Sequence, residues 1–350
     1  MAAYILKRLL LMIPTLFGVM LITFVVTQFV PGGPVEQLIH QMQGRGAGGE
    51  ASGGTVKLYR GATGLDEERI QKLKALYGFD KPAPERFFDM MKNYLSFDLG
   101  ESYFHHQSVM SLVVSKLPVS ISLGLWTFFL TYLICIPLGV AKALYDGEPF
   151  DIITSTIILI GYAIPGFVLA IALLVLFGGG SFWDVFPLRG LTSDNFDELS
   201  WLGKITDYLW HMVLPITAMM VGSLAVMTML TKNSLIEEIR KQYVLVARAK
   251  GLSENAVLYR HAFRNALIPL VTGFPGAFIG AFFTGSLLIE TIFSLDGLGL
   301  LSYTAILQRD YPVVLGTLYL FTLLGLLAKL LSDLCYVLID PRIQFESVSK

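Results

Sequence analysis

Charge is scarce in this chain. Only 15% of its 350 residues are Asp, Glu, Lys or Arg, whereas an average soluble domain has roughly 25%. The formal net charge is −1, so no excess of one sign is available to attract nucleic acid or an acidic substrate. Because a globular surface needs more charge than this, the composition argues against a soluble enzyme and, more strongly, against a DNA-binding protein.

Cysteine is scarce as well. The two cysteines, Cys135 and Cys335, lie far apart, each inside an apolar run with no other Cys or His beside it. A disulfide framework or a zinc site requires closely spaced groups of such residues. We therefore expect neither, and we interpret both cysteines as small buried apolar side chains.

Signatures of catalysis are also missing. The chain has no G-x-x-x-x-G-K-[ST] phosphate-binding loop, no H-E-x-x-H zinc motif and no G-x-S-x-G nucleophile motif. The neighbouring His105 and His106 point apart on a regular helix or strand, so they do not form a metal site. The sequence therefore predicts no catalytic residue, no metal and no cofactor.

Long apolar stretches are what the chain does have. Hydrophobic residues make up 54% of it, and the mean hydropathy is +0.63. A helix needs about 20 apolar residues to cross the hydrocarbon core of a membrane. Six stretches are long enough: Leu9–Val30, Ser120–Leu144, Ile152–Phe177, Leu209–Leu230, Ala266–Ile289 and Val313–Ile339. The sequence thus predicts an all-α membrane protein with six transmembrane helices.

Basic residues set the expected orientation. The segment between the fourth and fifth stretches contains seven of them: Lys232, Arg240, Lys241, Arg248, Lys250, Arg260 and Arg264. Lys and Arg favour cytoplasmic loops, so this segment and both termini should be cytoplasmic. The loop Tyr145–Phe150, with Asp146 and Glu148, fits this orientation poorly, but acidic residues count little in the rule.

These considerations predict an order of segments along the chain. We expect an N-terminal transmembrane helix at residues 1–30 and a helical extracytoplasmic insertion at 31–117, of which 43–64 are rich in glycine. A five-helix core should follow at 118–340, with a cytoplasmic segment at 231–265, and a cytoplasmic tail at 341–350. Within the insertion, apolar periodicity predicts helices from Asp66 to Gly78 and over about Pro84–Leu95.

Charges within the apolar stretches are few. Lys329 and Asp333 are one helical turn apart, so we expect them to pair. Glu290 ends the fifth stretch and is expected at the membrane interface. Because no series of carboxylates forms a proton path, a stand-alone secondary transporter remains an alternative with little support. A membrane-embedded enzyme would need a reactive cluster that the sequence lacks.

Prolines are present in five of the six apolar stretches: Pro14, Pro137, Pro165, Pro215 and Pro275. Together with nearby glycines they are consistent with kinked, closely packed helices around a pathway. The ordinary composition of membrane helices explains them equally well, so both interpretations stay open.

The cytoplasmic segment carries the most specific local signals. Leu235–Lys250 is expected to continue the fourth helix, and Gly251 to end it in the left-handed conformation. Ser253 can cap a second, basic amphipathic helix over about Glu254–Asn265. A short helix held between two membrane spans cannot lie in a DNA groove, but it can dock into a cleft of a cytoplasmic partner.

Two runs in this segment, Tyr243–Ser253 and Arg260–Pro269, resemble the cytoplasmic motif of dipeptide and oligopeptide ABC-importer permeases. Further runs along nearly the whole chain resemble the same family: Tyr4–Pro14, Leu76–Pro82, Asp98–Ser102, Ala163–Phe167, His211–Pro215, Glu290–Ser294 and Arg309–Pro312. The general permease motif is E-A-A-x3-G-x9-I-x-L-P. Ala247 and Gly251 match it, whereas Leu245-Val246 and Phe263-Arg264 depart from it.

The resemblance implies a type I importer permease without an ATPase site. Its partners would be a second homologous permease, two cytoplasmic ATP-binding subunits, a periplasmic peptide-binding protein and the lipid of the inner membrane, with peptides as substrate. Asp296, where proline is usual, and the glycine-rich insert are similar to the subgroup for microcin C and oligopeptide uptake. The residues implied to couple transport to ATP hydrolysis are Ala247, Arg248, Ala249, Lys250, Gly251, Leu252, Ser253, Glu254 and Asn255.

Overall fold

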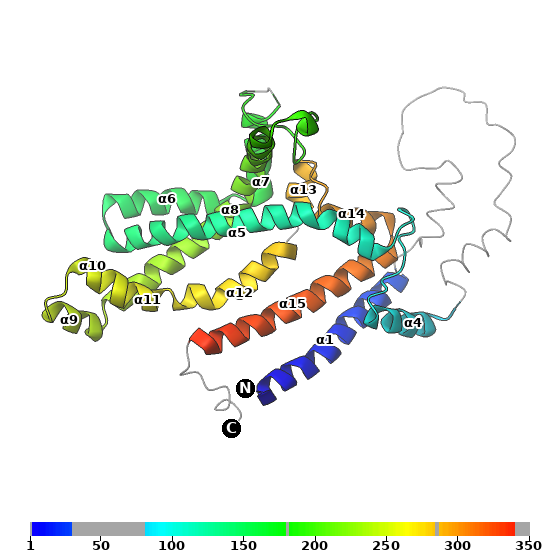
Figure 1. Cartoon of the computed structure of the whole chain (residues 1–350), viewed down its shortest axis with the longest axis horizontal. Helices are drawn as coiled ribbons and strands as arrows, with labels where there is room; N and C mark the ends of the chain where they lie inside the picture. Colours follow the sequence, from blue (N-terminus) through cyan, green and yellow to red (C-terminus); the bar gives the residue numbers. More distant parts are fainter. Residues whose placement is uncertain (1, 30–80, 180–181, 284–286, 340–350) are drawn as a thin grey trace. The chain divides into compact units, whose positions relative to one another are not determined.

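The computed structural model describes residues 2–29, 81–179, 182–283 and 287–339 (Figure 1). The glycine-rich stretch 43–64, the helix expected from Asp66 to Gly78 and the tail 341–350 lie outside these residues. Within them, regular structure is helical apart from two isolated β-bridges.

Four helices are long and apolar enough to cross a membrane: α1 (Ala2–Phe29), α5 (Val109–Leu144), α8 (Trp201–Ile239) and α15 (Tyr311–Ile339). Two pairs of shorter helices meet the same criterion together. The first pair is α6 (Pro149–Ala163) with α7 (Gly166–Phe177), bent by 99°. The second is Glu254–Ala266 with α12 (Ile268–Phe283), bent by 49°. The described residues thus contain up to six spans, which overlap the six expected stretches. In the fifth, α12 lies within the expected stretch Ala266–Ile289, whereas Glu254–Asn265 precedes it.

The prolines in these spans have different effects. Pro14, Pro137, Pro215 and Pro275 lie inside continuous helices. Pro165 instead separates α6 from α7 and precedes Gly166, the first residue of α7. Pro275 is also followed by glycine, yet it lies within the continuous α12, so the Pro-Gly pair alone does not explain the break at Pro165.

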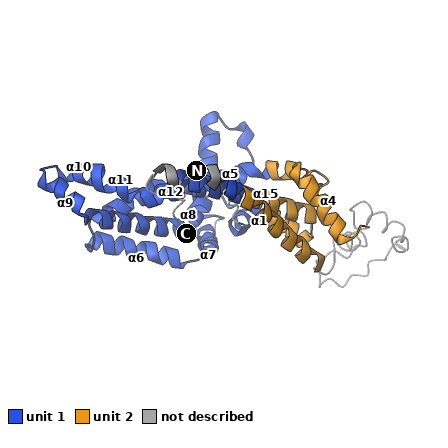
Figure 2. Ribbon diagram, turned by 90° about the horizontal axis from the view of Figure 1, so that it is seen from below, with its two compact units in different colours: residues 1–9, 116–301, 323–350 blue, residues 10–115, 302–322 orange. Residues whose placement is uncertain are grey.

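The chain divides into two compact units (Figure 2). One comprises residues 10–115 and 302–322. Within it, α4 (Ala83–Leu95) confirms the helix expected over about Pro84–Leu95. Its apolar stripe is buried. The ring of Phe87 packs against Phe17 and Phe24 of α1 at centroid distances of 5.4 and 5.3 Å, and Tyr94 packs against Tyr319 at 5.0 Å.

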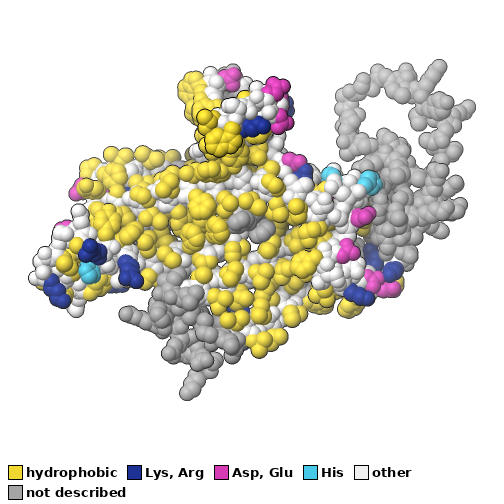
Figure 3. Space-filling view, viewed as in Figure 1, with side chains coloured by type: hydrophobic (Ala, Val, Ile, Leu, Met, Phe, Trp, Pro, Cys, Tyr) yellow, Lys and Arg dark blue, Asp and Glu magenta, His cyan; other side chains and the backbone are white. Residues whose placement is uncertain are grey.

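The other unit comprises residues 1–9, 116–301 and 323–350. A core cluster joins α5, α7 and α8 to the short helix α13 (Leu287–Ile292), with Leu123, Ala170, Met212 and Phe293 among its buried side chains. Much of the outer surface of the helices is apolar, as Figure 3 shows. Such a surface suits contact with lipid or with other membrane helices.

Two charged residues in the apolar stretches have partners that the sequence did not predict. Glu290 is 0% exposed, and its carboxylate accepts hydrogen bonds from Ser120 Oγ (3.3 Å) and from the backbone N–H of Leu300 (2.7 Å). Leu300 belongs to the first turn of α14 (Leu298–Gln308), where free N–H groups stabilise a carboxylate. The expected pairing of Asp333 with Lys329 is wrong, since Asp333 pairs with Arg8 at 2.8 Å.

Candidate functional site

The segment between α8 and α12 begins with a break that the sequence did not predict. The continuous helix expected over Leu235–Lys250 is wrong, since α8 ends at Ile239 and α9 (Gln242–Ala249) starts after the extended Lys241. Glu238 stabilises the break, because its carboxylate accepts from Lys241 Nζ and from the hydroxyl of Tyr243, each at 2.5 Å.

The turn at the end of α9 has the expected left-handed glycine. Gly251 has a φ of +81°. Its N–H donates to the carbonyl of Arg248 (2.9 Å), and the N–H of Leu252 donates to the carbonyl of Ala247 (3.4 Å). This pair of bonds defines a Schellman motif, which satisfies the last carbonyls of a helix and fixes the direction of the chain that follows.

The expected second helix follows at once. It consists of α10 (Glu254–Ala256), a π-helical turn, η2 (Val257–Ala262), and α11 (Phe263–Ala266). Ser253 caps it, as predicted, by accepting a hydrogen bond from the N–H of Ala256 (3.4 Å). An ion pair bridges the turn, since Arg248 holds the Glu254 carboxylate with Nε at 3.0 Å and a terminal nitrogen at 3.0 Å.

The inner face of this segment packs against the ends of α5 and α8. The buried members of that cluster are Val140, Ala143, Leu235, Val244, Ala247, Val257, Leu258, Ala262 and Ala266. Ala247 is only 4% exposed, so its small side chain serves close packing within this chain. The other eight candidate coupling residues, Arg248 to Asn255, are exposed. Lys and Arg side chains gather on the same part of the surface (Figure 3).

Tyr243 joins the start of the segment to its end. Its hydroxyl donates to Glu238 and accepts from Asn265 Nδ2 at 3.1 Å. Burial and the bond to Glu238 raise the pKa of Tyr243 above its ordinary value, and the bond to Glu238 raises the pKa of Lys241. The sequence analysis missed this junction, because Glu238 and Tyr243 are five residues apart on different helices and do not have the spacing of neighbours on one helix face.

A buried ionic cluster lies beneath the segment. Lys142 of α5 is 0% exposed, and its Nζ lies 2.9 Å from Asp151 Oδ1 on α6. Lys232 of α8 binds the other oxygen, Asp151 Oδ2, at 2.6 Å and also Asp146 Oδ1 at 2.9 Å. Asp146 is one of the acidic residues that fit the orientation rule poorly. The two lysines neutralise the charges of Asp146 and Asp151. These ion pairs connect the ends of α5, α6 and α8.

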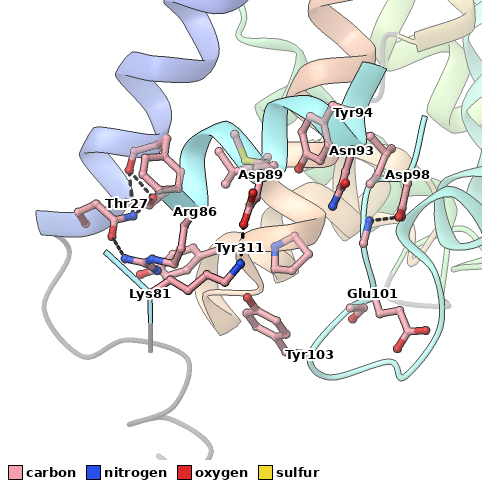
Figure 4. A pocket seen from close by; sticks show the side chains of 18 of the residues that line it. Thr27, Lys81, Arg86, Asp89, Asn93, Tyr94, Asp98, Glu101, Tyr103 and Tyr311 are labelled. Atoms are coloured by element: carbon pink, nitrogen blue, oxygen red, sulfur yellow. Dashed lines mark hydrogen bonds and ion pairs between the residues drawn. The ribbon is translucent and has the colours of Figure 1, made fainter. Parts of the chain in front are cut away.

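A polar pocket lies in the other unit (Figure 4). It has a volume of about 550 Å³ and is lined by residues of α1, α4, the loop after α4 and the start of α15. Several of its charged side chains form hydrogen bonds with other residues that line the pocket. Lys81 binds Asp89 at 2.7 Å, Arg86 donates to Gln28 at 2.6 Å, and Asp98 accepts from the N–H of Gly100 at 3.0 Å. No metal-binding group of three or more His, Cys, Asp or Glu occurs among residues that the structure describes.

The arrangement of the helices is the fold of type I ABC importer permeases. The solved MetNI methionine ABC transporter, in an inward-facing conformation, has the same fold, with a TM-score of 0.50 and 18% sequence identity. That match covers 66% of this chain and 97% of the other. Residues 135–345 match the family described as binding-protein-dependent transport system inner membrane component, and the chain belongs to this family.

Relatives are similar over their full length. The peptidoglycan transport system permease protein YejB of Agrobacterium fabrum is 58% identical, with 99% of each chain covered. The inner membrane ABC transporter permease protein YejB of Escherichia coli O157:H7 is 54% identical, and the oligopeptide transport system permease protein AppB of Bacillus subtilis is 30% identical. Both matches cover 99% of this chain and 100% of the relative. The chain is thus a multi-pass protein of the inner membrane.

Proposed function

We propose that this chain is one permease subunit of an ATP-driven importer that carries short peptides across the inner membrane. The similarity to an oligopeptide and a di/tripeptide permease over the whole chain is the observation that carries the proposal. Oligopeptides are the substrate class. A microcin C-like peptide belongs to the same class, because its backbone offers the same hydrogen-bonding groups.

The exposed residues Arg248 to Asn255 form the docking surface for a cytoplasmic ATPase. The Schellman turn at Gly251 aims the second helix, and the buried Ala247 anchors the turn to the ends of α5 and α8. The ionic cluster around Asp151 connects the same ends to α6. Movement of the ATPase cleft would therefore be transmitted to α5, α6 and α8 through these packed side chains and ion pairs. Rigid-body movement of the spans would then open the substrate path to one side of the membrane and close it to the other.

The proposed complex contains a second homologous permease, two ATP-binding subunits and a periplasmic peptide-binding protein. Both termini and the segment 231–265 are cytoplasmic, the insertion 31–117 is periplasmic, 118–340 is the permease core and 341–350 a cytoplasmic tail. The cations of the segment support this orientation, because Lys and Arg favour the cytoplasmic side. ATP is hydrolysed by the partners, since this chain has no phosphate-binding loop.

Purification and reconstitution test the proposal. The tagged chain, extracted in mild detergent, should co-purify with ATP-binding subunits, and the complex in vesicles should take up peptide only with ATP and loaded binding protein. The isolated chain should neither bind nor hydrolyse ATP. Uptake driven by an ion gradient without ATP would instead establish the secondary transporter, and hydrolysis by the isolated chain would contradict the assignment of ATPase activity to partners.

A further inference from the structure

The break between α6 and α7 leaves backbone acceptors without partners. Ile164 is extended (φ −86°, ψ 121°), and its N–H turns back to the carbonyl of Gly161 at 3.3 Å. Pro165 has no N–H to donate. Across the part of the chain that the structure describes, no hydrogen bond reaches the carbonyls of Tyr162, Ala163 and Ile164. All three residues are exposed.

These carbonyls lie in the middle of an apolar stretch. No charged residue occurs between Asp151 and Asp184, and large apolar side chains are exposed on both sides of the break, including Ile157 before it and Ile171 after it. Lipid offers no donor to a free carbonyl. Non-helical backbone at membrane depth therefore persists only where protein or a water-filled cavity surrounds it.

A hollow of about 580 Å³ adjoins the break. On one side it is lined by the break itself, and on the other by α8, including Met219, Ser223 and Met227. A Cβ at Gly222, another lining residue, would meet nothing within 4 Å. The hollow thus combines free acceptors, an exposed hydroxyl and two flexible methionine side chains.

We propose that this hollow is a peptide-contact site in the translocation path, where the free carbonyls accept hydrogen bonds from the backbone N–H groups of an extended peptide. Every peptide carries these donors, so the contact does not depend on sequence. Methionine side chains adapt to varied apolar shapes, which lets side chains of different peptides pass without selection at this point. This inference rests on the proposed function and adds where the substrate touches this subunit.

Cysteine labelling in the assembled transporter tests the site. The native Cys135 and Cys335 are first replaced by alanine, and this background is checked for ATP-driven peptide uptake in vesicles. Single cysteines are then placed in the hollow (Ser223→Cys and Met219→Cys). Matched controls on the same apolar stretch, Ile157→Cys and Ile171→Cys, are exposed in this chain by 64% and 47% but do not line the hollow.

A charged, membrane-impermeant thiol reagent should modify the hollow cysteines at least about tenfold faster than the controls, because the reactive thiolate forms where water reaches the sulfur. A transported peptide of varied sequence, supplied with binding protein and ATP, should slow labelling in the hollow and leave the controls unchanged. Two hollow positions are used so that one poorly assembled variant does not decide the result.

Equal labelling rates at all four positions would overturn the site, as would hollow cysteines that ignore the peptide. Cysteines that stay unreactive under all conditions would show that the second permease covers the break, which also overturns the proposal. In each of these cases ATP-driven peptide uptake by the same vesicles would leave the proposed function standing. Absence of that uptake in the wild-type complex would instead contradict the proposed function.

Discussion

Replacing Gly251 with valine tests whether the turn after α9 aims the segment that we propose to dock with the ATPase. A Cβ at this position would meet no heavy atom within 4 Å. The effect of valine is therefore conformational rather than steric. An L-residue in the left-handed region costs about 1–2 kcal/mol, and a β-branched residue lies at the upper end of that range.

The variant has two ways to respond. It can keep the φ of +81° at that cost, or it can adopt another φ and lose the two Schellman hydrogen bonds, each worth roughly 1 kcal/mol. The two costs are similar, so a large share of molecules should have a misdirected second helix. An energy of 1–2 kcal/mol changes a population ratio about 5- to 30-fold.

The assay uses assembled complexes in vesicles. Gly251→Val should insert normally and show weaker association with the ATP-binding subunits, or hydrolysis that loaded binding protein no longer stimulates. Gly251→Asn is the matched control, because asparagine tolerates the left-handed region, and it should remain close to wild type. Wild-type uptake and stimulation by the valine variant would refute the reasoning and place the docking helix elsewhere.

Three further changes test other parts of the structure by thermal unfolding in detergent. Asp151→Asn leaves the buried Lys142 without a carboxylate and Lys232 with Asp146 alone, and it should cost about 3–5 kcal/mol. Lys241→Met, at a more exposed pair, should cost less than about 1 kcal/mol; similar losses would contradict the cluster. Gly297→Ala would put a Cβ 2.6 Å from a buried carboxylate carbon and should destabilise by about 1–3 kcal/mol, while Gly18→Ala, with open space around it, should be neutral or gain up to about 1 kcal/mol. Equal effects of the two alanines would be inconsistent with that close contact. Tyr243→Phe should lower the free energy of unfolding by about 1–3 kcal/mol. Because the pKa of Tyr243 is raised from 10.0 in the folded protein, this loss relative to wild type should be complete below pH 10 and shrink at higher pH. A loss that grows at higher pH would refute the bond to Glu238.

Local signals in the sequence predicted the turn well. The left-handed Gly251 and the capping Ser253 depend on residues within one or two helical turns, and the structure has both. The six spans follow from apolar length alone. The break at Arg240–Lys241 was missed although its partners are local, because helix propensity there is outweighed by the bonds to Glu238.

Contacts between distant residues were beyond the same reasoning. The carboxylate of Glu290 is held by Ser120, which lies 170 residues earlier, and Lys232 binds Asp151 across 81 residues. Nothing in a single sequence pairs such positions. Lys329 was the nearest visible partner for Asp333, yet tertiary packing brings Arg8 to it instead. A charged residue within an apolar stretch therefore indicated that it has a hydrogen-bond or ion-pair partner, but it did not indicate which residue the partner is.

The π-helical turn over Val257–Ala262 places one extra residue within the helix Glu254–Ala266. A π-helical turn holds one residue more than an α-helical turn and closes its hydrogen bonds five residues apart. Val257 and Ala262, five positions apart, can therefore share the buried face, as residues four apart do in an α-helix. Moving the extra residue along the helix would change which side chains on either side of it face the ends of α5 and α8. The π-helical turn therefore sets which residues of Glu254–Ala266 are buried and which remain exposed for the docking that we propose.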